Sequence, residues 1–169
     1  MGYEIAGAFG AKLAEPDKEV YALVGDGSFM MLNSEIPTAM QENAKITVVV
    51  FDNCAFGCIN NLQMGNGVGS LATEMRHRNE TTGKLDGDYC YTDFGKIGEG
   101  FGMKEFRKAV QDAKKESVSC IIDAKVLPKT MAEGYESWWH IGVASTSKSD
   151  EVKAARKRID DHLAEARMY

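Results

Sequence analysis

Two polar residues that could bind a metal ion follow two of the most apolar stretches of the sequence. Asp26 comes after the apolar run of residues 19–24, and Asn53 comes after the β-branched run of residues 45–51. If both runs are parallel strands, their carboxyl ends meet at the sheet edge where open α/β sheets bind ligands. A carboxylate, an amide oxygen and a nearby backbone carbonyl suit Mg²⁺ or Ca²⁺ rather than zinc. The pattern therefore predicts a divalent-cation site between Asp26 and Asn53.

The residues around Asp26 could also hold a phosphate group. Gly25 and Gly27 allow a close approach to the backbone, and the amides of Gly27, Ser28 and Phe29 precede an expected helix, where they can receive an anion. Asp26 alone would repel a diphosphate, and a divalent cation between the two removes that objection. Taken singly, either motif is typical of a plain turn. The pair, each at a strand end, favours a site for a metal and a diphosphate.

Helices and strands alternate along the chain, which is the rhythm of a parallel sheet with right-handed crossovers. Strands are expected over residues 19–24, 45–51 and 118–126. Helices are expected from the N-terminus through Leu13, after a cap at Asn33 or Ser34, over residues 92–100 and 104–116, and from Ser147 onward. The predicted fold is a three-layer, doubly wound α/β sandwich with a mainly parallel sheet, over residues 1–147. A charged C-terminal helix follows over residues 148–169, and the polar stretch 65–91 has the length of a functional or disordered loop.

Composition narrows the class of protein. The 169 residues carry a net charge of −5, with 44% apolar and 27% charged residues, which suits one globular domain. The negative charge argues against a protein that coats nucleic acid, and the absence of an apolar run of membrane-spanning length argues against a membrane protein. Four cysteines without a CxxC pair indicate a reducing cytoplasm and disfavour a zinc site.

The Gly-Asp-Gly and asparagine pattern resembles the diphosphate-binding motif of thiamine diphosphate (ThDP) enzymes, although Asp52 stands where that family usually has a first asparagine. The resemblance implies ThDP and Mg²⁺ as cofactors, with Asp26, Asn53 and the Ala55 carbonyl as metal ligands. It also implies that Met1 is the apolar residue that wedges the bent cofactor. The implied cofactor-binding residues are Met1, Gly25, Asp26, Gly27, Ser28, Phe29, Asn53, Ala55, Phe56 and Gly57.

Three longer stretches sharpen the resemblance. Residues 1–8, 51–67 and 134–139 are similar to the trihydroxycyclohexanedione hydrolases of myo-inositol catabolism. This similarity implies an enzyme that opens a cyclic 1,2-dione with water to a deoxy sugar acid. It also implies that the chain is the C-terminal diphosphate-binding domain of a longer protein. The activating glutamate of the family lies in a separate pyrimidine-binding domain, so no catalytic residue is expected here and the chain alone should be inactive.

Two alternative functions stay open. One is an acetolactate-synthase-like or decarboxylase member of the same cofactor family, against which the stretch 59–67 argues. The other is a non-catalytic α/β module that binds a nucleotide or a partner. The resemblance further implies a homodimer or homotetramer that acts on a small polyhydroxylated dione, with the pyrimidine-binding domain as partner. The composition adds the expectation of a cytoplasmic protein that binds neither nucleic acid nor a membrane. The apolar face expected at that contact comprises Met1, Tyr3, Phe29, Met30, Phe56, Met64, Trp138 and Trp139.

One stretch departs from the family pattern. Residues 101–108 pass almost directly from the helix near Phe94 into the helix near Ala109, where the family has a short strand and a turn. A short deletion is therefore expected around residues 103–108, and it puts one strand of the sheet in doubt.

Overall fold

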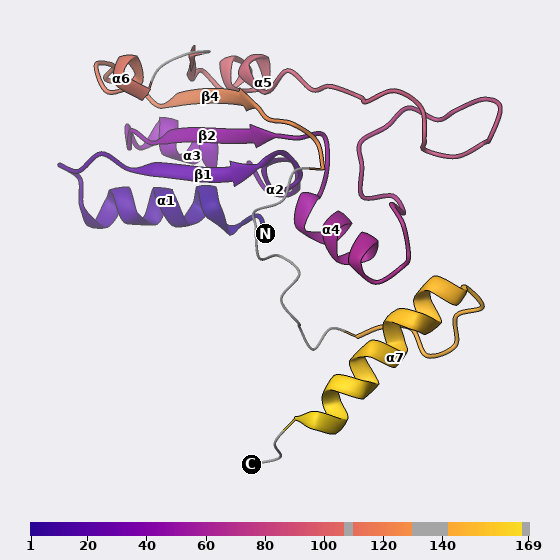
Figure 1. Cartoon of the computed structure of the whole chain (residues 1–169). Helices are drawn as coiled ribbons and strands as arrows, with labels where there is room; N and C mark the ends of the chain where they lie inside the picture. Colours follow the sequence, from indigo (N-terminus) through magenta and orange to yellow (C-terminus); the bar gives the residue numbers. More distant parts are fainter. Residues whose placement is uncertain (107–109, 130–141, 167–169) are drawn as a thin grey trace.

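The computed structural model describes residues 1–106, 110–129 and 142–166, and four parallel strands form one sheet in the order β1-β2-β4-β3 (Figure 1). The strands are β1 (Tyr21–Gly25), β2 (Thr47–Asp52), β3 (Lys104–Phe106) and β4 (Cys120–Lys125). The helices in the described residues are α1 (Tyr3–Ala14), α2 (Asp26–Met31), α3 (Glu35–Gln41), α4 (Gly57–Gly65), α5 (Phe94–Gly100), α6 (Val110–Ala113) and α7 (Asp150–Glu165). The predicted α/β class with a parallel sheet is confirmed.

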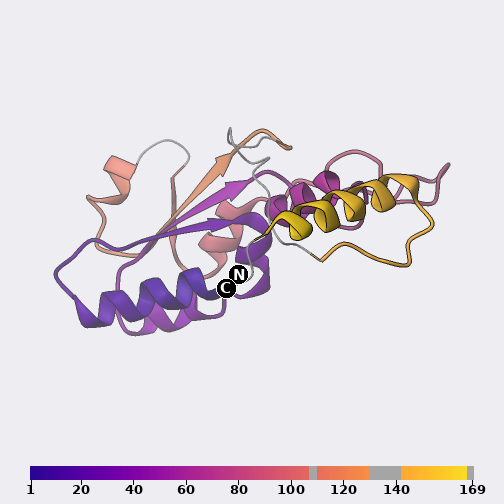
Figure 2. The ribbon, with the colours of Figure 1, turned by 60° about the horizontal axis from the view of Figure 1, so that its bottom comes forward.

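One face of the sheet carries the main hydrophobic core. Side chains alternate between the two faces of a strand, and the inward set packs against α1, α2, α3 and α5, which lie together on one side of the sheet (Figure 2). Phe29 of α2 and Phe94 of α5 are fully buried and meet edge to face, with ring centroids 5.3 Å apart. The strand residues of this core are Ala22, Val24, Val48, Val50 and Ile121.

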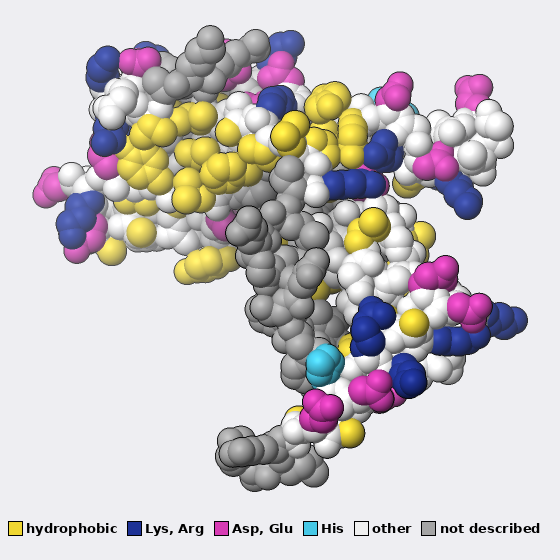
Figure 3. Space-filling model, in the orientation of Figure 1, with side chains coloured by type: hydrophobic (Ala, Val, Ile, Leu, Met, Phe, Trp, Pro, Cys, Tyr) yellow, Lys and Arg dark blue, Asp and Glu magenta, His cyan; other side chains and the backbone are white. Residues whose placement is uncertain are grey.

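The described residues cover the opposite face of the sheet only in part. Leu23 and Phe51 remain 62% and 42% exposed, and an apolar patch lies over β1, β2 and β4 (Figure 3). A small cluster beneath α6 comprises Val49, Ala113, Cys120 and Ile122. The described helices thus form one full layer and, through α6, part of the second helical layer that a three-layer sandwich requires.

The C-terminal helix lies away from the sheet. The hydroxyl of Ser149 accepts a hydrogen bond from the Val152 amide and caps α7 at its start. One guanidinium nitrogen of Arg158 reaches the Gly65 carbonyl at 3.4 Å, which places α7 beside the end of α4 (Figure 1). Its apolar side packs in a separate small cluster of Val143, Val152, Ala155 and Ile159.

The helix predicted over residues 104–116 is wrong. Lys104–Phe106 form β3, which pairs in parallel with β4 from Cys120 to Ile122, and among the described residues the helix α6 covers Val110–Ala113. The strand that the expected deletion put in doubt is therefore present, although it has three residues. Such a strand is too short to show the alternation by which sequence reveals strands.

The stretch predicted as a long loop folds back on itself. Antiparallel bridges join Ala55 to Glu74 and Arg76 to Tyr89, and the Met75 amide donates to the Cys54 carbonyl at 2.7 Å. This segment therefore packs against the turn that follows β2, where the candidate site begins.

Candidate functional site

The carboxyl ends of β1 and β2 bring Asp26 and the turn after Asp52 together. Gly25 is in register with Phe51, so the residues that follow the two strands are neighbours. The Ala55 amide donates to Asp26 Oδ2 at 3.1 Å, and the Gly27 amide donates to Asp26 Oδ1 at 2.7 Å. Each carboxylate oxygen can accept a further interaction, because an ionised carboxylate has about four lone-pair directions. Asp26 is therefore fixed by the backbone and still able to bind a cation.

Asn53 opens a tight turn that glycine makes possible. A Cβ on Gly57 would lie 2.7 Å from Asn53 Nδ2, so a larger residue would displace the amide side chain. Between Asn53 and Ala55, the buried Cys54 has φ of +53°, in the left-handed region that few non-glycine residues adopt. Residues held in such conformations cluster at functional sites, where the surrounding structure stabilises them.

The amides expected to receive an anion lie in the first turn of α2, a helix that the sequence did not predict. Gly27 already donates its amide to Asp26, and the Ser28 amide, in the first turn, has no acceptor within the helix. The Phe29 amide lies four residues after the N-cap Gly25, where the first intrahelical hydrogen bond of a helix forms. A Cβ on Gly27 would lie 2.6 Å from the ring of Phe56, so glycine lets that ring pack against the helix start. The sequence Asp-Gly-Ser is typical of turns, which hid this six-residue helix.

The remaining predicted residues take different places. The Phe29 side chain is fully buried in the core, so its expected position on an apolar contact face is wrong and only its backbone can contribute to a site. Met1 is 63% exposed, and Gly2 packs close to Leu32 with φ of +83°, which places Met1 beside the end of α2. Tyr3, Met30 and Met64 are exposed and Phe56 is half-buried, whereas Trp138 and Trp139 lie outside the described residues.

The carboxyl groups of Asp26 and Asp52 are buried next to each other. Burial raises the pKa of Asp26 to about 6, and the facing carboxyl of Asp52 adds to the rise. Burial also acts to raise the pKa of Asp52, but hydrogen bonds from the Lys125 ammonium and the Cys54 amide outweigh it and hold that pKa below its ordinary value. Near neutral pH, Asp52 is therefore ionised, and Asp26 is the carboxyl that a cation would stabilise.

We expect Asp26→Asn to change how the stability of the metal-free protein depends on pH. Because the folded pKa of about 6 lies above the ordinary 3.8, ionising Asp26 in the folded state costs free energy. That cost increases as pH rises through this window, so the wild type should lose stability relative to Asp26→Asn. Thermal unfolding with a chelator at a series of pH values from about 4.5 to about 7.5 measures the difference. Parallel profiles would contradict the pKa direction.

Two side chains of the site escaped sequence reasoning. The first is Glu4, whose Oε1 accepts a hydrogen bond from the Ser28 hydroxyl at 3.1 Å, and no spacing rule links the start of α1 to α2. Lys125, the last residue of β4, pairs with Asp52, with which it is in register. The charge of Lys125 at a strand end was the one signal that could have found it.

The polar residues of the segment after α4 are engaged with one another. The carboxylate of Glu74 pairs with Arg76 at 3.1 Å and accepts from the Tyr89 hydroxyl at 3.0 Å, and the guanidinium stacks 3.8 Å from the Tyr89 ring. Burial opposes ionisation of Glu74, but these contacts prevail and lower its pKa to about 2. Arg78 donates to the Gly83 carbonyl. Both arginines therefore support the loop through contacts within it.

Two of the four thiols should react rapidly with a thiol reagent. Cys58 and Cys90 are exposed, whereas Cys54 and Cys120 are buried, and burial raises the pKa of Cys54 to about 12. Because the thiolate is the reacting form, Cys54 should be inert in the folded protein. A count of fast-reacting thiols before and after denaturation tests this, with the double variant Cys58→Ser/Cys90→Ser as a blank. Fast labelling that persists in that variant would contradict it.

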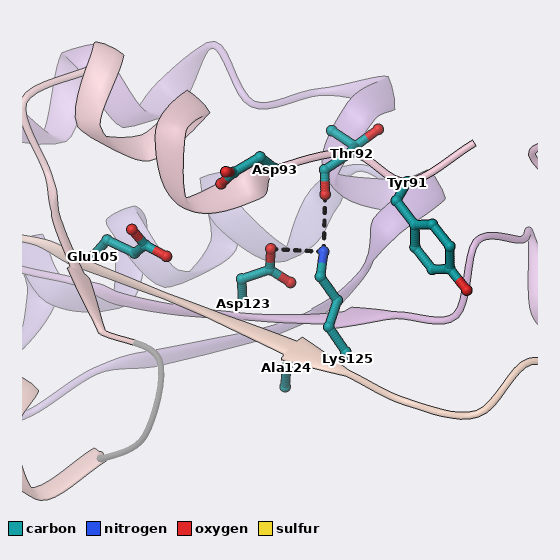
Figure 4. Close-up of a pocket in the computed structure, with 7 residues that line it drawn as sticks. All are labelled: Tyr91, Thr92, Asp93, Glu105, Asp123, Ala124 and Lys125. Carbon is teal, nitrogen blue, oxygen red and sulfur yellow. Dashed lines mark hydrogen bonds and ion pairs between the residues drawn. The ribbon is translucent and has the colours of Figure 1, made fainter. Parts of the chain in front are cut away.

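A cavity of about 600 Å³ lies beside the site, at the carboxyl end of β4 (Figure 4). Lys125 extends into this region and bonds Asp123 and the Thr92 carbonyl. None of the predicted metal ligands lines this cavity. Its lining residues are Tyr91, Thr92, Asp93, Glu105, Asp123, Ala124 and Lys125.

The described residues contain no group of three or more His, Cys, Asp or Glu side chains that could hold a metal. A cation at the end of β1 would therefore need an amide oxygen and a backbone carbonyl beside the carboxylate of Asp26. Oxygen ligands of this kind are those that hard divalent cations prefer.

Comparison with known proteins shows that the chain is similar to part of a group of longer hydrolases. It is 58% identical to 3D-(3,5/4)-trihydroxycyclohexane-1,2-dione hydrolase 1 of Bacillus cereus over 177 aligned positions. It is 57% identical to the 3D-(3,5/4)-trihydroxycyclohexane-1,2-dione hydrolase of Geobacillus thermodenitrificans. Each alignment covers 100% of this chain and 28% of the relative, so the chain spans little more than a quarter of their length. Because the alignment is longer than the 169 residues of this chain, it contains gaps in this chain, and the expected deletion would produce such gaps.

The fold is shared with a solved enzyme of the same cofactor class. The thiamine diphosphate-dependent 4-hydroxybenzoylformate decarboxylase of Rhodococcus jostii RHA1 superposes with a TM-score of 0.62 and 20% identity, over 77% of this chain and 24% of that one. The family model described as "Thiamine pyrophosphate enzyme, C-terminal TPP binding domain" matches residues 1–127. The chain therefore belongs to the thiamine pyrophosphate enzyme family and carries its C-terminal cofactor-binding domain.

Proposed function

We propose that this chain is the diphosphate- and Mg²⁺-binding part of a ThDP-dependent hydrolase. The full-length enzyme would open a trihydroxycyclohexane-1,2-dione with water to a deoxy sugar acid, as a step of myo-inositol catabolism. The observation that carries this proposal is the 57–58% identity, over the whole chain, to proteins named as hydrolases of that dione. The likeness to a decarboxylase rests on 20% identity and supports the fold alone.

The residues at the ends of β1 and β2 fit a diphosphate held through a divalent cation. Asp26 offers carboxylate oxygens, Asn53 an amide oxygen and Ala55 a carbonyl within one turn of chain, and Gly57 leaves the space that the amide needs. The proposed cofactor contacts are Met1, Gly25, Asp26, Gly27, Ser28, Phe29, Asn53, Ala55, Phe56 and Gly57. The proposed Mg²⁺ ligands are Asp26, Asn53 and the Ala55 carbonyl.

The chain contributes position rather than acid–base chemistry. ThDP, when bound, supplies a nucleophilic carbon and an electron sink. The first-turn amide of Ser28 would receive a phosphate, and Asp26 would bind the cation beside it, so that the reacting end of the cofactor is held at one place. We assign no catalytic residue to this chain, and the activating glutamate belongs to the proposed pyrimidine-binding domain. The isolated chain should therefore bind ThDP and Mg²⁺ but should not turn over the dione.

The proposed assembly is a cytoplasmic homodimer or homotetramer in which another domain faces this site. Exposed apolar side chains near the site, such as Met1 and Tyr3, support a contact there. The open sheet face with Leu23 and Phe51 supports a second contact, because parallel sheets are normally covered on both faces. No helix among the described residues is long and apolar enough to cross a membrane.

Turnover by the full-length protein tests the function. With ThDP and Mg²⁺, the cyclic dione should be consumed and one equivalent of acid released, while 2-oxo acids such as pyruvate or benzoylformate should be inert. Turnover of a 2-oxo acid instead would favour a decarboxylase or an acetolactate-synthase-like enzyme. A full-length protein that binds no ThDP would favour the non-catalytic module.

A further inference from the structure

A lysine from a different strand supports the turn that carries the proposed metal ligands. Asp52 is 3% exposed and lies next to Asp26, so two carboxyl groups are buried together. Its Oδ1 accepts the Cys54 amide at 3.0 Å, and its Oδ2 pairs with the Lys125 ammonium. Asp52 therefore connects the Asn53–Ala55 turn to the end of β4.

The Lys125 ammonium uses all of its donors within the protein. A lysine ammonium has three N–H groups. They meet Asp52 Oδ2, Asp123 Oδ2 at 2.8 Å and the Thr92 carbonyl at 2.8 Å, as Figure 4 shows for the last two. Burial lowers the pKa of Lys125, but the two carboxylates outweigh it, so the ammonium stays charged. An ammonium with three acceptors in place is suited to hold its partners rather than to bind a passing anion.

We infer that Lys125 is a positioning residue for the metal site. Its ammonium pairs with one oxygen of Asp52, and the other oxygen of Asp52 holds the Cys54 amide beside Asp26. The Cys54 backbone is in the left-handed region, and the bond from its amide to Asp52 stabilises that conformation. Asn53 and Ala55, on either side of it, are thereby kept in place. The inference rests on the proposed function, because the turn matters only if it carries metal ligands.

Removing Lys125 should weaken Mg²⁺ binding, and this loss should disappear when Asp52 is replaced by asparagine. In Lys125→Met, the buried Asp52 loses the ammonium that holds its Oδ2, which leaves its carboxyl without this partner beside Asp26 and disfavours an ordered turn. Loss of a group that orients a metal ligand typically costs 10–100-fold in metal affinity, so the apparent Kd for Mg²⁺ should rise at least about tenfold. Asp52→Asn keeps an oxygen for the Cys54 amide and removes the charge, so Lys125→Met/Asp52→Asn should bind Mg²⁺ about as well as Asp52→Asn alone.

The experiment is a double-mutant cycle on the full-length protein. Calorimetric Mg²⁺ titrations in the presence of ThDP, together with Tm values in Mg²⁺ and in chelator, are measured for the wild type, both single variants and the double variant. Lys96→Met is the matched control, because this lysine is 76% exposed on α5 and pairs with Asp93 at 3.4 Å. Its Mg²⁺ affinity should equal that of the wild type.

Three outcomes would overturn the inference. In the first, the losses of Mg²⁺ affinity in Lys125→Met and Asp52→Asn add in the double variant. In the second, Lys125→Met lowers Tm equally with and without Mg²⁺ while its Mg²⁺ affinity stays that of the wild type. Lys125→Met could also raise only the KM for the dione, which would make Lys125 a substrate contact. Asp26→Ala separates these from failure of the proposed function: if that variant also keeps its Mg²⁺ affinity, the metal site itself is misplaced.

Discussion

Asp26→Ala should abolish Mg²⁺-dependent binding of ThDP while the fold persists. Asp26 is the proposed metal ligand whose negative charge would bind the cation directly. Its two oxygens lie between the carboxyl ends of β1 and β2, where they accept the amides of Gly27 and Ala55. Changes in groups that only orient a metal ligand cost 10–100-fold in affinity, so loss of the ligand should cost more than about 100-fold. Calorimetry with ThDP, with and without Mg²⁺, on the full-length protein measures this loss.

Asp26→Asn is the control for this prediction. The amide keeps the volume and one of the two acceptor oxygens, so it can accept from the amide of Gly27 or from that of Ala55 but not from both, and it removes the buried charge beside Asp52. This variant should fold without metal and should still bind ThDP poorly. If Asp26→Ala retained the wild-type affinity for ThDP in Mg²⁺, Asp26 would not be a metal ligand.

Phe29→Ala should destabilise the protein more than any change at the surface. Phe29 is fully buried and packs edge to face on Phe94, at the point where α2 meets α5. Truncation of a buried phenylalanine typically costs 3–5 kcal/mol, from lost burial and from the cavity left behind, and we expect about that loss in the free energy of unfolding. Urea unfolding followed by circular dichroism provides the measurement.

The neighbouring methionine gives the matched comparison. Met30 follows Phe29 on α2 but is 43% exposed, so Met30→Ala should change the free energy of unfolding by no more than about 0.5 kcal/mol. A large effect of Met30→Ala together with a small effect of Phe29→Ala would mean that the expected contact face, rather than the core, is the correct place for Phe29.

The positions of the candidate site residues could be predicted from sequence because these residues follow strands with a clear apolar pattern. The β-branched run that became β2 and the apolar run that became β1 fix where Asp26 and Asn53 lie, and parallel pairing then brings their loops together. The short elements could not be predicted, because α2 begins with turn-forming residues and β3 has three residues. Their conformation is decided by packing against β4 and α5, which local sequence does not encode.

Pairings between distant residues were the other gap. Sequence reasoning treated the neighbour of Asn53 as a departure from a motif and could not see that Asp52 has a cation from β4. It also placed Phe29 on the apolar face expected to contact another subunit, whereas the side chain is fully buried in the core. In each case the missing information was which strand or helix lies opposite, which only the tertiary structure supplies.

The register between β2 and β4 has a consequence for the order in which the site assembles. Asp26 and Ala55 are 29 residues apart in the chain, whereas Asp52 and Lys125 are 73 apart, and closing the longer loop carries the larger entropic cost. The β1–β2 half of the site can form early, but the turn gains its last support when β4 docks, late in folding or after most of the chain has left the ribosome. Protection of the Cys54 amide from hydrogen exchange should therefore appear among the last during refolding.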